Sequence, residues 1–370
     1  MDVYERLGLS RVINASGRMT ALGGSTLSAG VMAAMDDAAS TYVDVAELRR
    51  RAAQRIAALA GAPAAAITTG AAAGIATMVA AVVAGTDPGR VAALPLADWQ
   101  PREILLQTGH AVDFGGSVTQ MVRIGGGAPR LVGAANAVRA ADLRAAFGPT
   151  AAAVLFIQSH HAVQKGMLGL AEVLALAHAA ALPVLVDAAA EEDAGRYVAL
   201  GADLVAYSGG KAFGGPTAGF IVGREDLVAA CEAQEGGVGR PMKVGKETIA
   251  GLLQALEEYQ GRDDEAARAL WDARVERIRD ALADLPELTL TVAADEAGRA
   301  IRRLCLGTTA AAPFPLADLV DALRQGRPPI EVRAHHLSEG YVQIDPRPLA
   351  EGDAEAIARR VREWVVAGRA

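Results

Sequence analysis

The segment between residues 184 and 211 constrains the fold of this chain more than any other. It contains two short apolar runs, one that ends at Asp187 and one that spans residues 203–207, and the second leads into Ser208-Gly-Gly-Lys211. Short apolar runs bounded by small or polar residues predict buried strands. The sequence therefore predicts an acid at the end of one buried strand and a lysine just beyond the end of the next.

An acid and a lysine in these positions suit the chemistry of pyridoxal 5'-phosphate (PLP). That cofactor needs a lysine amine that forms an imine with its aldehyde, and a carboxylate that keeps its ring nitrogen protonated. Lys211 and Asp187 are the candidates for these two roles. Strand-ending acids and exposed lysines are also common in α/β proteins without such a function, so the pair alone does not decide between the two interpretations.

Small residues near both strands indicate a phosphate site. Ser208 offers a hydroxyl, and the two glycines after it let the backbone approach a ligand closely beside Lys211. The run Thr-Thr-Gly-Ala-Ala-Ala-Gly at residues 68–74 lies where a predicted strand passes into a helix, and free N–H groups at a helix start favour anions. Taken alone, that second run is better explained by close packing of an alanine-rich helix.

Strands and helices alternate along the first two thirds of the chain. Strands are predicted at residues 64–68, 103–107, 118–124, 151–158, 183–187, 204–207 and 219–222, and helices at 29–60, in two pieces, and at 170–181. This order is typical of an α/β fold with a mostly parallel sheet covered by helices. Because ligands bind beyond the carboxyl ends of such strands, we expect Thr69, Asp187 and Lys211 to lie together.

The pattern changes toward the C-terminus. Helices are predicted at residues 245–259 and on to 285, followed by strands at 288–292, 300–306, 330–333 and 341–344 and helices at 316–323 and 353–365. We therefore expect an N-terminal segment and a large domain over residues 1–260, and a small α+β domain over residues 261–370. The boundary is expected between Gln260 and Pro286.

Charge and cysteine content exclude several classes of protein. The net charge of -7 argues against nucleic acid as the main partner, because phosphate binding depends on concentrated positive charge. Cys231 and Cys305 have no partner at metal-ligand or redox spacing, which predicts buried free thiols. The N-terminus lacks the order of a signal peptide, and no apolar run is long enough to span a bilayer. We expect a cytoplasmic protein without a membrane partner.

A family resemblance extends over nearly the whole chain. The segments that carry it most clearly are residues 159–166, 187–193, 207–216 and 239–247. In these segments the chain resembles the D-glucosaminate-6-phosphate ammonia-lyase type enzymes. Those enzymes belong with the selenocysteine synthase-like (SelA-like) group of fold type I PLP proteins. The resemblance implies a large PLP-binding domain like that of aspartate aminotransferase. It also implies at least a homodimer, because fold type I enzymes generally complete each active site with a neighbouring subunit.

The resemblance also implies roles for individual residues. Lys211 would carry the cofactor and Asp187 would pair with its ring nitrogen. The residues implied to hold the cofactor phosphate are Thr69, Gly70, Ala71 and Ser208. His110 falls where a residue packs on the pyridine face, although a lone histidine is also explained as a structural hydrogen-bonding residue.

Several cationic residues are candidates for holding an anionic substrate. Arg333 follows a predicted strand of the small domain, and its planar guanidinium suits a bidentate contact with a carboxylate. A basic patch is formed by Arg240, Lys243 and Lys246. Two interpretations explain it equally well: contact with a phosphate, within one chain or across a dimer interface, and a solvated loop.

Two further pairs of polar side chains lie in the resembling segments. His160 and His161 point opposite ways if the chain is extended there, so at most one of them faces a substrate. No third ligand lies at a recognised spacing, and we expect no metal. Glu191 and Glu192 either assist proton transfer or cap a helix, and we favour the cap.

The resemblance implies a PLP-dependent lyase. The reaction that it implies removes the β-hydroxyl and ammonia from an amino-sugar acid such as D-glucosaminate or its 6-phosphate, and gives a 2-keto-3-deoxy acid. The alternatives are a racemase or epimerase, an aldol-type lyase, selenium transfer onto seryl-tRNA, and a non-catalytic binding protein. The acidic chain disfavours a tRNA substrate. The presence of both Asp187 and Lys211 argues against a non-catalytic protein.

Overall fold

The computed structural model describes residues 2–113, 115–159, 162–295 and 299–368, which form two compact units. The larger unit is Ser25–Gly261, and the smaller one combines Met1–Gly24 with Arg262–Ala370. The expected division differs in one respect, because it grouped residues 1–24 with the large domain. The reason is a strand pair: β1 (Ile13–Ala15) runs parallel to β11 (Ile330–Val332) in the smaller unit.

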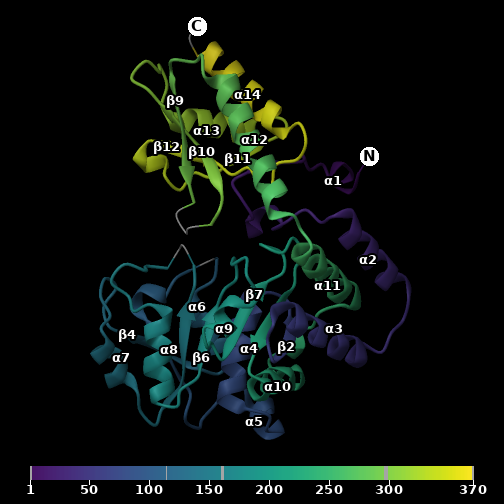
Figure 1. Ribbon diagram of the computed structural model, residues 1–370, viewed down its shortest axis with the longest axis vertical. Helices are drawn as coiled ribbons and strands as arrows, with labels where there is room; N and C mark the ends of the chain where they lie inside the picture. The colour runs from purple at the N-terminus through teal and green to yellow at the C-terminus, as the bar shows by residue number, and fades with distance from the viewer. Residues whose placement is uncertain (1, 114, 160–161, 296–298, 369–370) are drawn as a thin grey trace. The chain divides into compact units, whose positions relative to one another are not determined.

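A seven-stranded sheet forms the centre of the larger unit (Figure 1). Its strands, in spatial order, are β2 (Ala64–Thr68), β8 (Gly219–Gly223), β7 (Leu204–Ser208), β6 (Val184–Asp187), β5 (Ala151–Ile157), β3 (Glu103–Gln107) and β4 (Ala128–Val132). Within this sheet, β8 runs antiparallel to both of its neighbours, β2 and β7, and the other described strand pairs are parallel. The predicted α/β fold with a mostly parallel sheet is confirmed.

Helices cover both faces of this sheet (Figure 1). They are α2 (Ala29–Ser40), α3 (Val45–Ala60), α4 (Ala71–Ala84), α5 (Pro88–Ala93), α6 (Val118–Ile124), α7 (Ala140–Ala146), α8 (Leu170–Ala179), α9 (Arg196–Ala199), α10 (Glu225–Ala233) and α11 (Lys246–Gln260). Short 3-10 turns are η2 (Thr108–His110), η3 (Gln234–Gly236) and η4 (Arg240–Met242).

The central strands are buried on both faces, which explains their continuous apolar sequence. Every residue of β5 and of β6 is buried. Val184 and Val186 join the core beneath α3, α8 and α11, whereas Leu185 joins the core beneath α4, α6 and α10. Alternate side chains therefore fill two separate cores, and polar side chains are left only at the strand ends.

One predicted strand is wrong. Residues 118–124 form helix α6, and the neighbouring strand β4 was not predicted. The run is rich in β-branched residues, which favour strands. Its buried residues, however, are Val118 and Val122, four positions apart, and Met121 is partly buried beside them. A spacing of three to four residues gives one apolar helix face, and this packing outweighs the local propensity.

The smaller unit has the predicted α+β character. Its three-stranded antiparallel sheet has the order β12 (Tyr341–Ile344), β10 (Arg302–Thr308) and β9 (Leu288–Ala294). The other elements are α1 (Val3–Arg6), η1 (Thr20–Leu22), α12 (Asp264–Leu282), α13 (Leu316–Gln325), η5 (Leu337–Glu339) and α14 (Asp353–Ala367). Cys231, in the larger unit, and Cys305, in the smaller one, are buried free thiols, as predicted. Within the described ranges, no helix has the length and apolar character needed to cross a membrane.

Candidate active site

Asp187 is the last residue of β6 and is almost completely buried, with 3% of its surface exposed. Burial raises the pKa of its carboxyl to about 6, against the opposing effects of the positive charge of Lys211 and of the Ala189 N–H. That N–H donates to Asp187 Oδ1 at 3.2 Å. A carboxyl group in this setting lacks the hydrogen bonds that would normally stabilise its charge, so it favours a cationic partner.

Lys211 lies in the turn that follows β7 and is half-buried. The Gly209 N–H, at the start of the turn, donates to the Ala218 carbonyl at 2.8 Å. A Cβ atom on Gly209 would come within 2.5 Å of Leu252 in α11, so only glycine lets the turn lie this close to the helix. The turn therefore holds the lysine on the same side of the sheet as Asp187, close enough for their charges to interact.

The start of α4 forms the third part of this edge. Its N-cap residue, Gly70, has φ of +155° and offers no side chain to the free N–H groups of the first helical turn. A Cβ atom on Gly219 would lie 2.7 Å from Gly70 Cα, so the helix start packs directly against the start of β8. Gly219 is the register partner of Ser208 at the end of β7. Thr69, Gly70, Ala71 and Ser208 thus lie at one place, where N–H groups and a hydroxyl suit a phosphate.

His110 ends the turn η2, directly after β3, and is fully buried. The Ile157 N–H donates to its Nδ1 atom at 3.2 Å, which leaves the ring proton on Nε2. Burial lowers the pKa of the imidazole to about 4, so the ring is neutral near pH 7. Its ring meets Phe156 edge-to-face with centroids 4.6 Å apart. The buried Nε2 atom has no hydrogen-bond partner among the described residues.

Strand register links these groups into one continuous edge. Ile157, which hydrogen-bonds to His110, is the register partner of Asp187, and Asp187 is the register partner of Ala206 in β7. The order along the edge is therefore an imidazole N–H donor, a buried acid, a lysine and a helix N-terminus. PLP presents an aromatic ring, a basic ring nitrogen, an aldehyde and a phosphate, and each of these groups has a matching partner here. The residues present fit PLP.

The cationic candidates for substrate binding lie in both units. Arg333 follows β11 in the smaller unit, where its N–H and carbonyl pair with Gln343 at 2.9 Å each, and its substrate role stays a prediction. Arg240 and Lys243 are exposed around η4 in the larger unit. His160 and His161 lie outside the described residues.

Lys246 does not extend the basic patch that the sequence predicts. Its Nζ atom donates to the carbonyls of Ala38 and, at 2.8 Å, Ala39, at the end of α2. A lysine in this place satisfies carbonyls that lack helical partners and interacts favourably with the helix dipole. Lys246 is therefore bound to the protein itself, and Arg240 and Lys243 remain as exposed cations of this segment.

The predicted helix cap lies on a different acid. Glu191 accepts a hydrogen bond from the Tyr197 hydroxyl at 2.6 Å. Asp193 Oδ1 instead accepts the N–H groups of Gly195 at 2.9 Å and Arg196 at 3.1 Å, at the start of α9. The prediction that Glu191 caps the helix was wrong, because the shorter aspartate side chain reaches N–H groups two and three residues ahead, and the prediction for Glu192 is untested.

Two positioning contacts were not predicted from the sequence. The buried amide of Gln107, the last residue of β3, donates to the Leu168 carbonyl at 3.1 Å and accepts the Leu168 N–H at 2.7 Å. It thus ties the loop after β5 to the strand that carries His110. The other contact is made by the Ser25 hydroxyl with the carbonyls of Gly210 and Lys211. The available signal for Gln107 was one polar residue at the end of an otherwise apolar strand.

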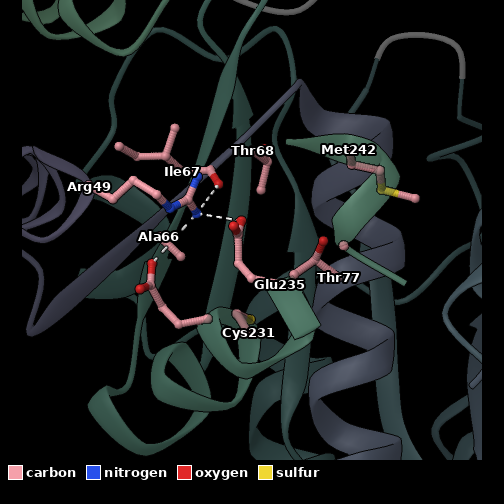
Figure 2. Close-up of a pocket in the computed structure, with 10 residues that line it drawn as sticks. Arg49, Ala66, Ile67, Thr68, Thr77, Cys231, Glu235 and Met242 are labelled. Atoms are coloured by element: carbon pink, nitrogen blue, oxygen red, sulfur yellow. Dashed lines mark hydrogen bonds and ion pairs between the residues drawn. The ribbon is translucent and has the colours of Figure 1, made fainter. Parts of the chain in front are cut away.

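A separate hollow lies along the outer edge of β2 (Figure 2). Arg49 from α3 reaches into it, donates to the Ile67 carbonyl at 3.3 Å and pairs with Glu235 at 2.6 Å. Asp187, Lys211 and His110 are not among the residues that line it. Because β2 is an end strand of the sheet, we interpret Arg49 as a residue that satisfies and covers its free edge.

The chain is similar to known proteins over most of its length. The family model described as "SelA: L-seryl-tRNA selenium transferase" matches residues 12–280. The chain is 42% identical over 364 residues to a D-glucosaminate-6-phosphate ammonia lyase of Salmonella typhimurium (strain 14028s / SGSC 2262), covering 98% of this chain and 97% of the relative. It is 44% identical over 366 residues to a 5'-C-glycyluridine monooxygenase-decarboxylase of a Streptomyces species, covering 98% and 92%.

A solved structure of D-glucosaminate-6-phosphate ammonia-lyase is also similar. It matches with a TM-score of 0.93 and 40% identity, and the match covers 100% of both chains. The family model spans more than half of the chain, and both relatives are similar over nearly their whole length. The chain therefore belongs to the SelA family, within the fold type I enzymes that use PLP.

Proposed function

We propose that this protein is an ammonia-lyase that acts on an amino-sugar acid such as D-glucosaminate or its 6-phosphate. It removes the β-hydroxyl and the amino group and releases a 2-keto-3-deoxy acid. The observation that carries the chemistry is the buried acid Asp187 beside Lys211 at the carboxyl edge of the sheet. The substrate class is supported by the ammonia-lyase relative and by the structure with the same name.

PLP, when bound, supplies an aldehyde that takes up amines and a ring that accepts an electron pair. Asp187 would accept a hydrogen bond from the protonated ring nitrogen and so gain the positive partner that its buried carboxylate lacks. Thr69, Gly70, Ala71 and Ser208 would hold the phosphate, and the short turn after β7 would present Lys211 for attachment to the aldehyde.

Lys211 has two tasks in this proposal. Its amine would hold the cofactor until the substrate amine takes its place. The freed amine would then remove the α-proton and deliver it to the β-hydroxyl, which leaves as water. A proton from solvent would be added at the β-carbon and a second water would replace the nitrogen, so that the net products are the 2-keto-3-deoxy acid and ammonia.

His110 serves as a fixed hydrogen-bond donor against the ring face. Its pKa of about 4 makes it neutral near pH 7, so it does not act as the acid or base there. The Nε2–H, which lacks a partner among the described residues, donates to the bound ligand. His110→Phe should weaken ligand binding, and it should also lower stability because the buried Ile157 N–H loses its acceptor.

The anionic groups of the substrate need cationic partners. We assign Arg333 to the carboxylate and Arg240 and Lys243 to a phosphate when the substrate carries one, with His160 as a further contact. Guanidinium groups suit such contacts because they bind two oxygens at once. Arg240→Ala and Lys243→Ala should each raise KM for the phosphorylated substrate more than for the unphosphorylated one. An equal change for both substrates would show that these two residues do not hold the phosphate.

The protein is proposed to be at least a homodimer in the cytoplasm. Tyr42, in the connection between α2 and α3, is fully exposed, and Val43 and Val45 beside it are about half exposed. A group of exposed apolar side chains favours contact with another protein surface, here a second copy. Light scattering on the purified protein tests the dimer, and a monomer at working concentration contradicts it.

A second candidate function is favoured by the relative that shares 44% identity. That relative is a 5'-C-glycyluridine monooxygenase-decarboxylase, so a similar sequence is compatible with an oxygen-dependent reaction on a glycyl nucleoside. The two functions differ in what they consume and release. The lyase needs no oxygen and releases ammonia, whereas the oxygenase needs O2 and releases CO2.

The discriminating experiment follows from that difference. The PLP-loaded protein is incubated with D-glucosaminate, its 6-phosphate and a 5'-C-glycyl nucleoside, under argon and under air. Ammonia and 2-keto acid from a sugar acid under argon support the proposal. Turnover of the nucleoside alone, with O2 uptake, refutes it in favour of the second function.

A further inference from the structure

The Ser25 side chain lies against the turn that carries Lys211. Ser25 Oγ is 3.0 Å from the Gly210 carbonyl oxygen and 3.2 Å from the Lys211 carbonyl oxygen. Ser25 is the first residue of the larger unit, 186 positions before Lys211 in the sequence. One hydroxyl proton is thus shared between two main-chain acceptors.

These two carbonyls belong to the peptide groups on either side of the Lys211 Cα atom. Other contacts fix the ends of the turn: the Gly215 N–H donates to the Gly209 carbonyl at 2.8 Å, and the Gly214 N–H donates to the Lys211 carbonyl at 3.2 Å. The Ser25 hydroxyl acts at the centre. By holding the two peptide planes that flank Lys211, it fixes the direction in which the Cα–Cβ bond leaves the turn.

We infer that Ser25 is a positioning residue that aims the Lys211 amine at its reaction partner. The inference rests on the proposed role of Lys211. A long, flexible lysine side chain reaches a small target efficiently only if its base is fixed, and a misplacement of about 1 Å can reduce a rate by about a hundred-fold. Loss of the hydroxyl should therefore slow every step that uses the amine, and leave substrate affinity nearly unchanged.

The test compares Ser25→Ala with Ser25→Thr and with a matched control. Threonine keeps the hydroxyl and should restore function. Ser40→Ala is the control, because the Ser40 hydroxyl also donates to a main-chain carbonyl, that of Asp37 at 2.8 Å, but within its own helix. The readouts are the rate at which PLP becomes attached to Lys211, trapped with borohydride and measured by peptide mass spectrometry, together with kcat, KM and the thermal unfolding midpoint.

For Ser25→Ala we expect attachment to Lys211 and kcat to fall by about 10-fold, with KM changed by less than about 2-fold. Ser25→Thr should stay within about 3-fold of the wild type, and Ser40→Ala should match it. Attachment and kcat of Ser25→Ala equal to those of the wild type would overturn the inference.

Two further outcomes also overturn it: an equal loss in Ser40→Ala, or a loss in both Ser25 variants that follows a lowered unfolding midpoint. A wild-type protein that shows no label on Lys211 is a different result, because it refutes the proposed function itself.

Discussion

Two buried aspartates, one in each unit, have pKa values that are shifted in opposite directions. In the smaller unit, Asp345 is fully buried, and it receives hydrogen bonds from Arg303 Nε at 3.0 Å and Arg347 Nη2 at 2.8 Å. Burial alone would raise the pKa of Asp345, but the bonds to Arg347 and the charges of both arginines outweigh burial and hold the pKa well below its usual range. Asp187, almost as deeply buried, has a raised pKa.

This difference supports the proposal that Asp187 is the functional acid. Arg303 and Arg347 balance the charge of Asp345 within the protein, so we interpret Asp345 as a residue that stabilises the smaller unit. Among the described residues, Asp187 accepts one hydrogen bond, from the Ala189 N–H, and its other stabilising partner is the charge of the half-buried Lys211. A buried carboxyl that the protein leaves undersatisfied is suited to a ligand that brings a positive charge.

The largest expected effect concerns the lysine beside Asp187. Lys211→Ala should reduce turnover by more than about a thousand-fold, because it removes both the attachment point of the cofactor and the base. The same change should raise the pKa of Asp187 further, since the opposing positive charge is lost. Steady-state kinetics tests the first effect, and Lys165→Ala, at an exposed lysine, is the control. A Lys211→Ala variant that retains activity would show that Lys211 is neither the attachment point of the cofactor nor the base.

The next effect concerns Asp345. Asp345→Asn should lower the free energy of unfolding by about 3 to 5 kcal/mol, because Arg303 and Arg347 both lose a buried anion, although Arg303 keeps its ion pair with Asp295 at 2.6 Å. Urea denaturation measures this change. Asp321→Asn, which removes an exposed ion pair with Arg324, should cost less than about 1 kcal/mol. Similar losses in the two variants would show that the Asp345 cluster is not a source of stability.

A smaller effect of opposite sign is expected at Asp187 in the cofactor-free protein. Its folded pKa of about 6 lies above the ordinary value of 3.8, so the carboxyl destabilises the fold increasingly between about pH 4 and 6 and fully above that range. Asp187→Asn should therefore raise the free energy of unfolding at pH 8 by about 1 to 3 kcal/mol, with little change near pH 4.

Catalysis should respond to Asp187→Asn in the other direction, with kcat reduced by about a hundred-fold or more, because a neutral amide does not keep the ring nitrogen protonated. Stability from Asp345 has the opposite pH dependence: it is complete above about pH 4 and is lost as the pH falls below that value. Denaturation curves at several pH values measure how each acid's contribution to the free energy of unfolding changes with pH. A change in the same direction for Asp187 and Asp345 would contradict the difference between them.

The smallest effect concerns Lys246. Lys246→Met keeps the length of the side chain and removes the donor to the carbonyls at the end of α2, so it should cost about 0.5 to 1 kcal/mol of stability. The kinetic constants should not change, in contrast to those of Lys243→Met with a phosphorylated substrate. A rise in KM for Lys246→Met would return this lysine to the substrate site.

Local pattern was sufficient to predict most of the fold and the centre of the site. Continuous apolar runs predict β5, β6 and β7, and the acid and lysine beyond two of them predict the carboxyl edge. Residues 118–124 were misassigned because β-branched composition and helical spacing disagree within one short run. The pairing of Ile13–Ala15 with Ile330–Val332 joins segments over 300 positions apart, which no local pattern records.

The positioning residues were beyond prediction for the same reason. Ser25, Gln107 and Asp345 act through contacts with segments distant in the sequence, and a serine, glutamine or aspartate at such positions looks like any other polar residue. Lys246 and Glu191 show the converse: residue type and neighbourhood indicated a function, but the partner that the fold supplies decides the role.

The central claim is that the Lys211 amine holds PLP while Asp187 pairs with its ring nitrogen. Borohydride reduction of the PLP-loaded protein, followed by peptide mass spectrometry, tests it most directly. The account predicts a pyridoxyl label on Lys211 in the wild type, and no labelled lysine in Lys211→Ala. A label on a different lysine of the wild type, or tightly bound PLP that labels none, would contradict it.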